Sequence, residues 1–154
     1  MSASADLTWT ELAGADLDVR TLYDVLALRS AVFVVEQECA YLDLDGRDLV
    51  EDTCHVIGRR GGIAAYARVL APGADQPSPR IGRVIVAPDS RGQQLARPLM
   101  RRALAVCKTH WPGQAVELGA QAHLAGLYAS LGFEPVGDQY DEDGIAHVLM
   151  RRGT

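Results

Sequence analysis

Apolar residues recur along the chain with two different periods, which together predict a mixed α/β protein. Short apolar or alternating runs favour strands, and they fall at residues 6–11, 55–58, 63–70, 80–87, 115–119, 133–140 and 145–151. Apolar residues three and four positions apart are typical of helices that bury one face, and they occupy residues 17–35, 94–108 and 124–131. The resulting order, β-α-(α)-β-β-β-α-β-α-β-β, predicts an α/β or α+β fold around a mixed sheet.

Capping and breaking residues mark the ends of the predicted helices. Asp16 or Asp18 is placed to cap the first helix, and Gly132 follows the third, where glycine commonly ends a helix. Pro98 is compatible only with the first turn of the second helix, because the first four N–H groups of a helix have no internal acceptor. Residues 36–52 lack a sustained period, so we expect irregular chain or a short helix there.

Turn residues separate the predicted strands without dividing the chain into domains. Residues 59–62 (Arg-Arg-Gly-Gly) and 141–144 (Asp-Glu-Asp-Gly) predict two hairpins. Residues 71–79 hold three prolines and a glycine, and they predict a loop between strands. We find no internal repeat and expect a single domain over residues 1–154.

Composition limits the partners and the location. The 154 residues are 48% hydrophobic, enough for one buried core, and the net charge of -5 argues against a nucleic-acid binder. No run reaches the roughly 18 apolar residues of a membrane span, and residues 1–10 lack the pattern of a signal peptide. We therefore expect a cytoplasmic protein with neither a nucleic-acid nor a membrane partner. The three cysteines are Cys39, Cys54 and Cys107, and their wide spacing predicts free thiols and no metal site.

Charge is distributed unevenly along the chain. Residues 36–52 contain seven acidic side chains against one arginine, and residues 80–102 contain six arginines against one aspartate. The first segment could attract a cationic group and the second an anionic group. Charge counts alone leave a second interpretation equally open, in which both segments are solvated faces.

A strand, a tight turn and a helix follow one another between Val84 and Met100, and the turn contains Gly92. Such turns direct several backbone N–H groups and the positive end of a helix at one point, for which phosphate is a natural ligand. The turn is not a Walker loop, because no Gly-Lys-Ser/Thr follows it, and a single glycine does not make a dinucleotide fingerprint. These absences disfavour a nucleotide-binding protein.

Two stretches together resemble the GNAT superfamily of acetyl-CoA-dependent N-acetyltransferases. The family signature, Arg/Gln-x-x-Gly-x-Gly/Ala, corresponds to residues 91–96, and the family's tyrosine before Leu-Gly-Phe corresponds to Tyr128. The resemblance narrows to the ElaA-like branch through five strings that occur in the same order. They lie at residues 29–37, 43–46, 81–86, 119–124 and 142–147.

The resemblance implies a GNAT-type acyl-CoA N-acyltransferase fold, with a sheet splayed between the strands predicted at residues 80–87 and 115–119. Pantetheine would pair in that gap with the unsatisfied backbone groups of Val84, Ile85 and Val86. The pyrophosphate would lie on the turn. Its expected ligands are the N–H groups of Gly92, Gln93, Gln94, Leu95 and Ala96 and the side chains of Arg91 and Arg97.

One residue departs from the family pattern, because Gln94 occupies the position of the signature's central glycine. Glycine permits a close approach of the backbone, whereas Gln94 adds a Cβ and an amide. We therefore expect weaker or slightly displaced binding of the CoA phosphates rather than its loss, since the backbone N–H remains.

Acetyl transfer to an amine requires a neutral amine, a stabilised oxyanion and a proton for the departing thiolate. Tyr128 fits the third role, because its phenol can donate a proton to a thiolate. A strand N–H near Val86 could polarise the thioester carbonyl. For the base, His123, Glu36 and His147 are all candidates, and each has an alternative interpretation as a structural or surface group.

The function implied by the resemblance is an N-acetyltransferase that uses acetyl-CoA as its cosubstrate and needs no metal. The resemblance also puts residues 36–52 at the acceptor-binding wall, so their carboxylates would select a cationic small-molecule or peptide amine. The alternative is a non-catalytic acyl-CoA-binding module, which Gln94 mildly favours, whereas Tyr128 favours the enzyme. A homodimer is an open alternative to a monomer.

Overall fold

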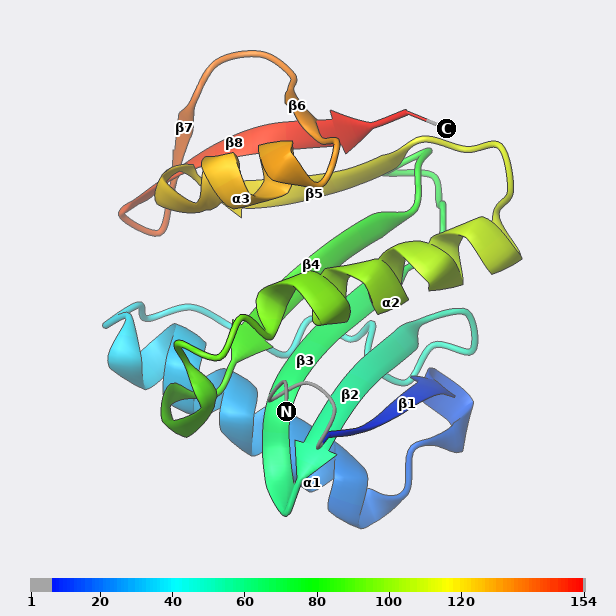
Figure 1. Ribbon diagram of the computed structural model, residues 1–154, viewed down its shortest axis with the longest axis vertical. Coiled ribbons are helices and arrows are strands. Elements are labelled where there is room, and N and C mark those ends of the chain that lie inside the picture. Colours follow the sequence, from blue (N-terminus) through cyan, green and yellow to red (C-terminus); the bar gives the residue numbers. More distant parts are fainter. Residues whose placement is uncertain (1–6, 154) are drawn as a thin grey trace.

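The computed structural model describes residues 7–153, and one eight-stranded mixed sheet runs through it (Figure 1). The strand order is β1-β2-β3-β4-β5-β8-β6, with β7 also paired to β8. The strands are β1 (Thr8–Ala13), β2 (Cys54–Arg60), β3 (Gly62–Leu70), β4 (Arg80–Val86), β5 (Val116–Gln121), β6 (Glu134–Pro135), β7 (Tyr140–Glu142) and β8 (Ile145–Arg152). Neighbouring strands are antiparallel except β4 and β5, which are parallel. The predicted fold class is confirmed.

Helices cover both faces of this sheet. Val25 of α1 (Val19–Arg29) and Val32 of the π-helical segment η3 (Ser30–Glu36) pack on one face against Tyr66 and its neighbours. The helices α2 (Ala96–His110) and α3 (Ala125–Ser130) pack on the other face, over the larger core. Figure 1 shows α2 and α3 on the near side of the sheet and α1 on the far side. Three short 3-10 turns are η2 (Gly14–Asp16), η4 (Pro88–Ser90) and η5 (Ala122–Leu124).

The ends of the helices follow the predicted caps. Asp18 caps α1, since its carboxylate accepts a hydrogen bond from the backbone N–H of Thr21 at 2.6 Å. Pro98 lies in the first turn of α2 and therefore removes no internal hydrogen bond. The helix predicted over residues 17–35 is present, but its second part is the π-helical η3, which spacing alone does not distinguish from an α-helix.

The prediction of one strand over residues 133–140 is wrong. Within residues 133–140, only the short strand β6 and the first residue of β7 pair with β8, and the chain between them leaves the sheet. Pro135 has no N–H for the ladder, and Gly137 has a φ of 80°, a left-handed conformation that turns the chain. Asp6, where the first predicted strand begins, lies outside the described residues, and β1 starts at Thr8.

The sheet is split between β4 and β5, as the resemblance implies. The two strands pair at Arg80 and Glu117, and no further pairing between them occurs within the described residues. β4 also carries a bulge opposite β3, where Arg83 adopts a φ of 52°. Figure 1 shows the two halves of the sheet diverging from the end where β4 begins.

A buried group of ion pairs fastens the irregular segment between η3 and β2 to the sheet. We call it the aspartate–arginine network; its members are Arg29, Asp43, Asp45, Asp48, Arg68 and Arg83. The fully buried Arg29 donates to Asp43 at 2.8 Å and also to Asp48. Arg68 of β3 donates to Asp45 at 2.7 Å and to Asp48 at 3.0 Å. Arg83, from the bulge of β4, donates to Asp43 at 2.8 Å.

This network argues against the prediction that the carboxylates of residues 36–52 select a cationic acceptor at the acceptor-binding wall. Three of the seven carboxylates in the segment, those of Asp43, Asp45 and Asp48, face arginines of this network, and a fourth, that of Glu36, pairs with Arg91. Burial would raise the pKa of Asp48, but hydrogen bonds and attraction from Arg29 and Arg68 hold it below its usual value. These charges are compensated inside the fold and do not form an acidic surface for an acceptor.

Replacing Asp48 with asparagine should destabilise the fold by roughly 3–5 kcal/mol, because Arg29 and Arg68 would keep their charges without a shared partner. Urea unfolding of the variant and the wild type measures the difference. Asp52→Asn is the control, since Asp52 lies in the same segment but is exposed, and its loss should change the unfolding free energy by less than about 0.5 kcal/mol. An equally small change for Asp48→Asn would contradict the prediction.

Asp48→Asn and the wild type should also differ in how their unfolding free energies change at acid pH. The pKa values of Asp45 and Asp48 are lowered in the folded protein, whereas an aspartate in an unfolded chain titrates near pH ~4. Their stabilising contribution is therefore complete above pH ~4 and is lost as the pH falls toward the lowered values. Below pH ~4 the unfolding free energy should fall less steeply with pH in Asp48→Asn than in the wild type.

Candidate active site

The turn between β4 and α2 is shaped to receive an anion. The 3-10 turn η4 follows β4, and positive φ angles at Gly92 (79°) and Gln94 (59°) bring the chain to the start of α2. Leu95 is the N-cap and no side chain caps this end, so the first N–H groups of α2 are available to a ligand. The turn and the end of β4 line a hollow of about 360 Å³.

Gln94 has the left-handed backbone conformation that glycine adopts most readily. This conformation costs a non-glycine residue about 1–2 kcal/mol. The backbone at this position therefore has a conformation that the signature's glycine can also adopt. Gln94 differs from that glycine only by its exposed side chain. That Gln94 weakens phosphate binding stays a prediction.

Arg91 is held by Glu36, the last residue of η3. Its two terminal guanidinium nitrogens each donate to a carboxylate oxygen of Glu36 at 2.7 Å, and its Nε donates to the carbonyl of Val86 at 3.1 Å. Hydrogen bonding to Arg91 lowers the pKa of Glu36. Both carboxylate oxygens are thus engaged, which makes Glu36 the counter-ion of Arg91 and a poor candidate for the base.

Two other arginines flank the turn. Arg97 lies in the first turn of α2 and is exposed. Arg60, at the end of β2, donates to the side-chain oxygen of Gln93 at 2.7 Å. Sequence reasoning missed Arg60, because the two residues are 33 positions apart and are brought together by the sheet. Its only signal was the Arg-Arg-Gly-Gly turn, which indicates a hairpin but not what the hairpin approaches.

The end of β4 that precedes the turn borders the gap. Val84 packs on the α2 face, Ile85 on the α1 face and Val86 beside Leu95. Because β5 has diverged at this level, the backbone groups that β4 directs toward it have no strand partner among the described residues. An extended chain with its own amides could complete the sheet along this edge.

Tyr128 lies in α3, on the α2 face of the sheet, and is 5% exposed. Its ring packs edge-on against Phe133, with the ring centroids 6.2 Å apart. Burial raises the pKa of Tyr128 to about 12, so the hydroxyl is protonated at neutral pH. A donor for a departing thiolate has to be in this form, and the catalytic role of Tyr128 stays a prediction.

The two histidines considered as bases have different surroundings. His123 belongs to η5 and is exposed. His147 lies on β8, is 8% exposed and has its Nδ1 2.8 Å from the carbonyl oxygen of Ile145. Of the two histidines, only His147 has a ring whose orientation is fixed by a hydrogen bond within the described residues.

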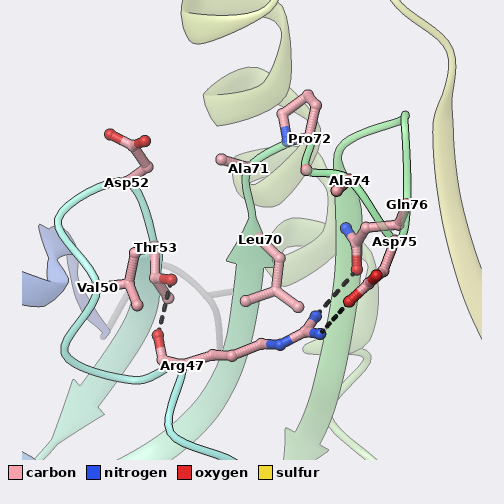
Figure 2. Close-up of a pocket in the computed structure, with 11 residues that line it drawn as sticks. Arg47, Val50, Asp52, Thr53, Leu70, Ala71, Pro72, Ala74, Asp75 and Gln76 are labelled. Carbon is pink, nitrogen blue, oxygen red and sulfur yellow. Dashed lines mark hydrogen bonds and ion pairs between the residues drawn. The ribbon is translucent and has the colours of Figure 1, made fainter.

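A second hollow, of about 240 Å³, lies at the opposite end of β4, between the loop after β3 and the segment before β2 (Figure 2). Figure 2 shows Arg47 reaching across it to Gln76 at 3.2 Å and to Asp75 at 3.8 Å. The hydroxyl of Thr53 donates to the carbonyl of Arg47 at 2.8 Å. These polar groups satisfy one another, and we assign this hollow no chemical role.

Residues 7–153 contain no three histidine, cysteine, aspartate or glutamate side chains grouped as a metal site would require. In the same range, no helix is both long and apolar enough to cross a bilayer. The three cysteines are buried and free, as predicted. Burial raises the pKa of Cys54 to about 11 and of Cys107 to about 12, so these thiols stay protonated and unreactive.

Known proteins resemble this chain over most of its length. The family model described as "Acetyltransferase (GNAT) domain" matches residues 34–153. Protein ElaA of Escherichia coli (strain K12) is 47% identical over 147 residues, which cover 95% of this chain and 96% of that protein. A crystal structure of E. coli ElaA has a TM-score of 0.89 at 46% identity and covers 95% of this chain and 99% of its own.

A crystal structure of an acyl-CoA N-acyltransferase from Pseudomonas aeruginosa has a TM-score of 0.91 at 44% identity, covering 96% of this chain and 99% of that one. The family match includes β4, the turn, Tyr128 and β8, which carry the features described above. The resemblance inferred from the sequence is therefore confirmed. The chain belongs to the GNAT family of acyltransferases, whose enzymes use acyl-CoA to acylate amines.

Proposed function

We propose that the protein transfers the acetyl group of acetyl-CoA to a primary amine by direct attack of the amine on the thioester. The observation that carries the proposal is the gap between β4 and β5, which widens toward the anion-binding turn and has the protonated Tyr128 on one face. Family membership supports acyl transfer from CoA. Acetyl as the acyl group, and a primary amine as the acceptor, are our additions.

Acetyl-CoA would lie along the gap. Its pantetheine amides would pair with the backbone of residues 84–86, and its pyrophosphate would accept hydrogen bonds from the N–H groups of residues 92–96. Arg97 and Arg60 supply positive charge on either side of the turn. Arg91 can turn the paired face of its two terminal nitrogens to a phosphate only by leaving Glu36, although one further N–H on each nitrogen stays free.

In the reaction, the amine nitrogen bonds to the thioester carbon and the carbonyl oxygen becomes an oxyanion. A backbone N–H near Val86, on the open edge of β4, would stabilise that oxyanion. Collapse of the intermediate breaks the C–S bond, and Tyr128 would give its proton to the leaving sulfur. The nitrogen loses a proton as the amide forms, which restores the phenol through solvent.

The second candidate function is an acyl-CoA-binding module without turnover. The presence of Gln94 in place of the signature's glycine supports it. A binding module, however, has no need for a proton donor, a role that the buried and protonated phenol of Tyr128 on the α2 face would fill.

Release of CoA thiol from acetyl-CoA, measured across a panel of polyamines, aminoglycosides, amino acids and lysine peptides, tests the proposed function. We expect release that depends on the amine, because the thiolate leaves only after the nitrogen attacks. Propionyl-CoA and longer acyl-CoAs in the same assay report which acyl group is preferred. Calorimetric binding of acetyl-CoA without release by any amine would support the binding module instead.

Tyr128→Phe should lower turnover by about 10²–10⁴-fold while the Kd for acetyl-CoA stays nearly constant, because the ring and its packing are kept and only the proton donor is lost. Tyr23→Phe, on the exposed face of α1, is the control and should have no effect. A loss of only a few-fold would mean that water protonates the thiolate. A large rise in Kd would make Tyr128 a CoA contact.

Glu36→Gln should tighten CoA binding by up to about fivefold and leave turnover within a few-fold of the wild type. The reason is that Arg91 would no longer be held by a carboxylate and could pair with the pyrophosphate. Glu38→Gln, which removes a charge from an exposed side chain two positions along, controls for net charge. If Glu36→Gln instead abolished turnover at unchanged affinity, Glu36 would be the base after all.

A further inference from the structure

The two faces of β8, the strand that pairs with β5 on the side away from β4, carry different residues. On β8, Val148 and Met150 pack into the core that contains Tyr128. Side chains alternate along a strand, so His147 points to the opposite face, on the side of α1. In register with it are Gln121 of β5 and Tyr140 of β7. The proposed acid and this histidine are therefore separated by the sheet.

His147 is held in a single orientation. Its Nδ1 lies 2.8 Å from the carbonyl oxygen of Ile145, which can only accept, so Nδ1 carries a proton and Nε2 keeps a lone pair when the ring is neutral. The ring of Tyr140 stacks on it, with centroids 5.9 Å apart and planes inclined by 25°. A fixed tautomer with a free Nε2 lone pair is what a general base requires.

The Nε2 atom faces a carboxylate. One oxygen of Glu142 lies 3.4 Å from Nε2 of His147, and the side chain of Glu142 is 59% exposed. When the ring is neutral, both atoms are acceptors, so the contact becomes favourable when Nε2 takes up a proton or when a proton donor lies beside both atoms. An ammonium group carries several such protons and the charge that a carboxylate attracts.

Hydrogen bonds connect this position to the turn that would bind CoA. Gln121, in register with His147, donates to the side chain of Gln37 at 3.2 Å. Gln37 directly follows Glu36, which pairs with Arg91. The Sγ of Cys39 also donates to the carbonyl of Asp143 at 3.0 Å, which ties the turn between β7 and β8 to the same segment. His147 thus lies beside the end of β5 that is no longer paired with β4.

We propose that His147 is the general base that takes a proton from the acceptor ammonium, and that Glu142 binds the same ammonium beside it. This rests on the proposed acetyl transfer. The amine loses one proton to Nε2, which passes it to solvent, and the neutral nitrogen then forms the C–N bond. The second proton leaves the nitrogen as the C–S bond breaks and balances the one that Tyr128 gives to sulfur.

The test compares His147→Gln with the wild type in amine-dependent thiol release, with spermidine, benzylamine and a lysine peptide as acceptors. At pH 7 these ammonium groups need a base, and kcat/KM should fall by about 10²–10⁴-fold. At pH 10, close to the pKa of ~10.4 of a lysine ammonium, a substantial fraction of the amine is neutral without a base, so the defect should shrink by at least about tenfold. The groups that face His147 from β7, Glu142 and Tyr140, are unchanged in both proteins.

Each outcome discriminates. A loss of the same size at both pH values would mean that His147 only supports the structure. No loss at either pH would overturn its role as the base. An unchanged Kd for acetyl-CoA shows that the variant is folded. Glu142→Gln should raise KM for the amine more than it lowers kcat, because Glu142 is proposed to bind the ammonium.

His110→Gln is the control for loss of a histidine, since His110 is exposed at the end of α2. If His123→Gln showed the loss instead, the base would be His123, and if the wild type released no thiol, the proposed function itself would fail.

Discussion

Pairing between three arginines and three aspartates beneath the sheet determines where the parts of the active site lie. The segment between η3 and β2 has no regular ladder to place it, and it is fixed by carboxylates that meet Arg29, Arg68 and Arg83. Arg83 comes from the bulge at which β4 stops following β3 in register, so one side chain joins the irregular segment to the strand at the gap. Buried charges of this kind require a specific partner and favour one arrangement of the chain over others.

In the proposed reaction, the split sheet would divide the proton transfers between two environments. Tyr128 is enclosed by the core under α2 and α3, where burial keeps its proton in place. His147 and Glu142 lie on the side of α1, near exposed chain from which a charged amine can arrive. An acceptor approaching on one face and a thiol leaving on the other would not compete for the same space. Pantetheine, filling the gap as a strand, would separate the two sides.

Much of the fold and of the candidate site could be predicted from the sequence. The features that could not be predicted depend on residues that are distant in the sequence. Strands and helices follow from local periods, and the turn between β4 and α2 follows from residues adjacent in sequence. The acidic segment was misinterpreted because its charge is local, whereas Arg29 and Arg68 lie 14 to 23 positions away. The pairing of Glu36 with Arg91 spans 55 positions and was equally invisible. Pro135 and Gly137 are local signals against a strand, and both lie where the chain leaves the sheet.

The number of residues in the π-helical segment η3 determines the direction in which Glu36 points. Its two ends are fixed by side chains, with Arg29 just before it in the buried network and Glu36 at its end on Arg91. A π turn contains one residue more than an α turn, and each residue advances an α-helix by about 100°. Losing one residue between these anchors would let the segment relax to an α-helix with Glu36 on nearly the same side, whereas gaining one residue would swing Glu36 to another side. Substitutions within η3, and the loss of its one extra residue, can keep this phase, whereas an insertion cannot.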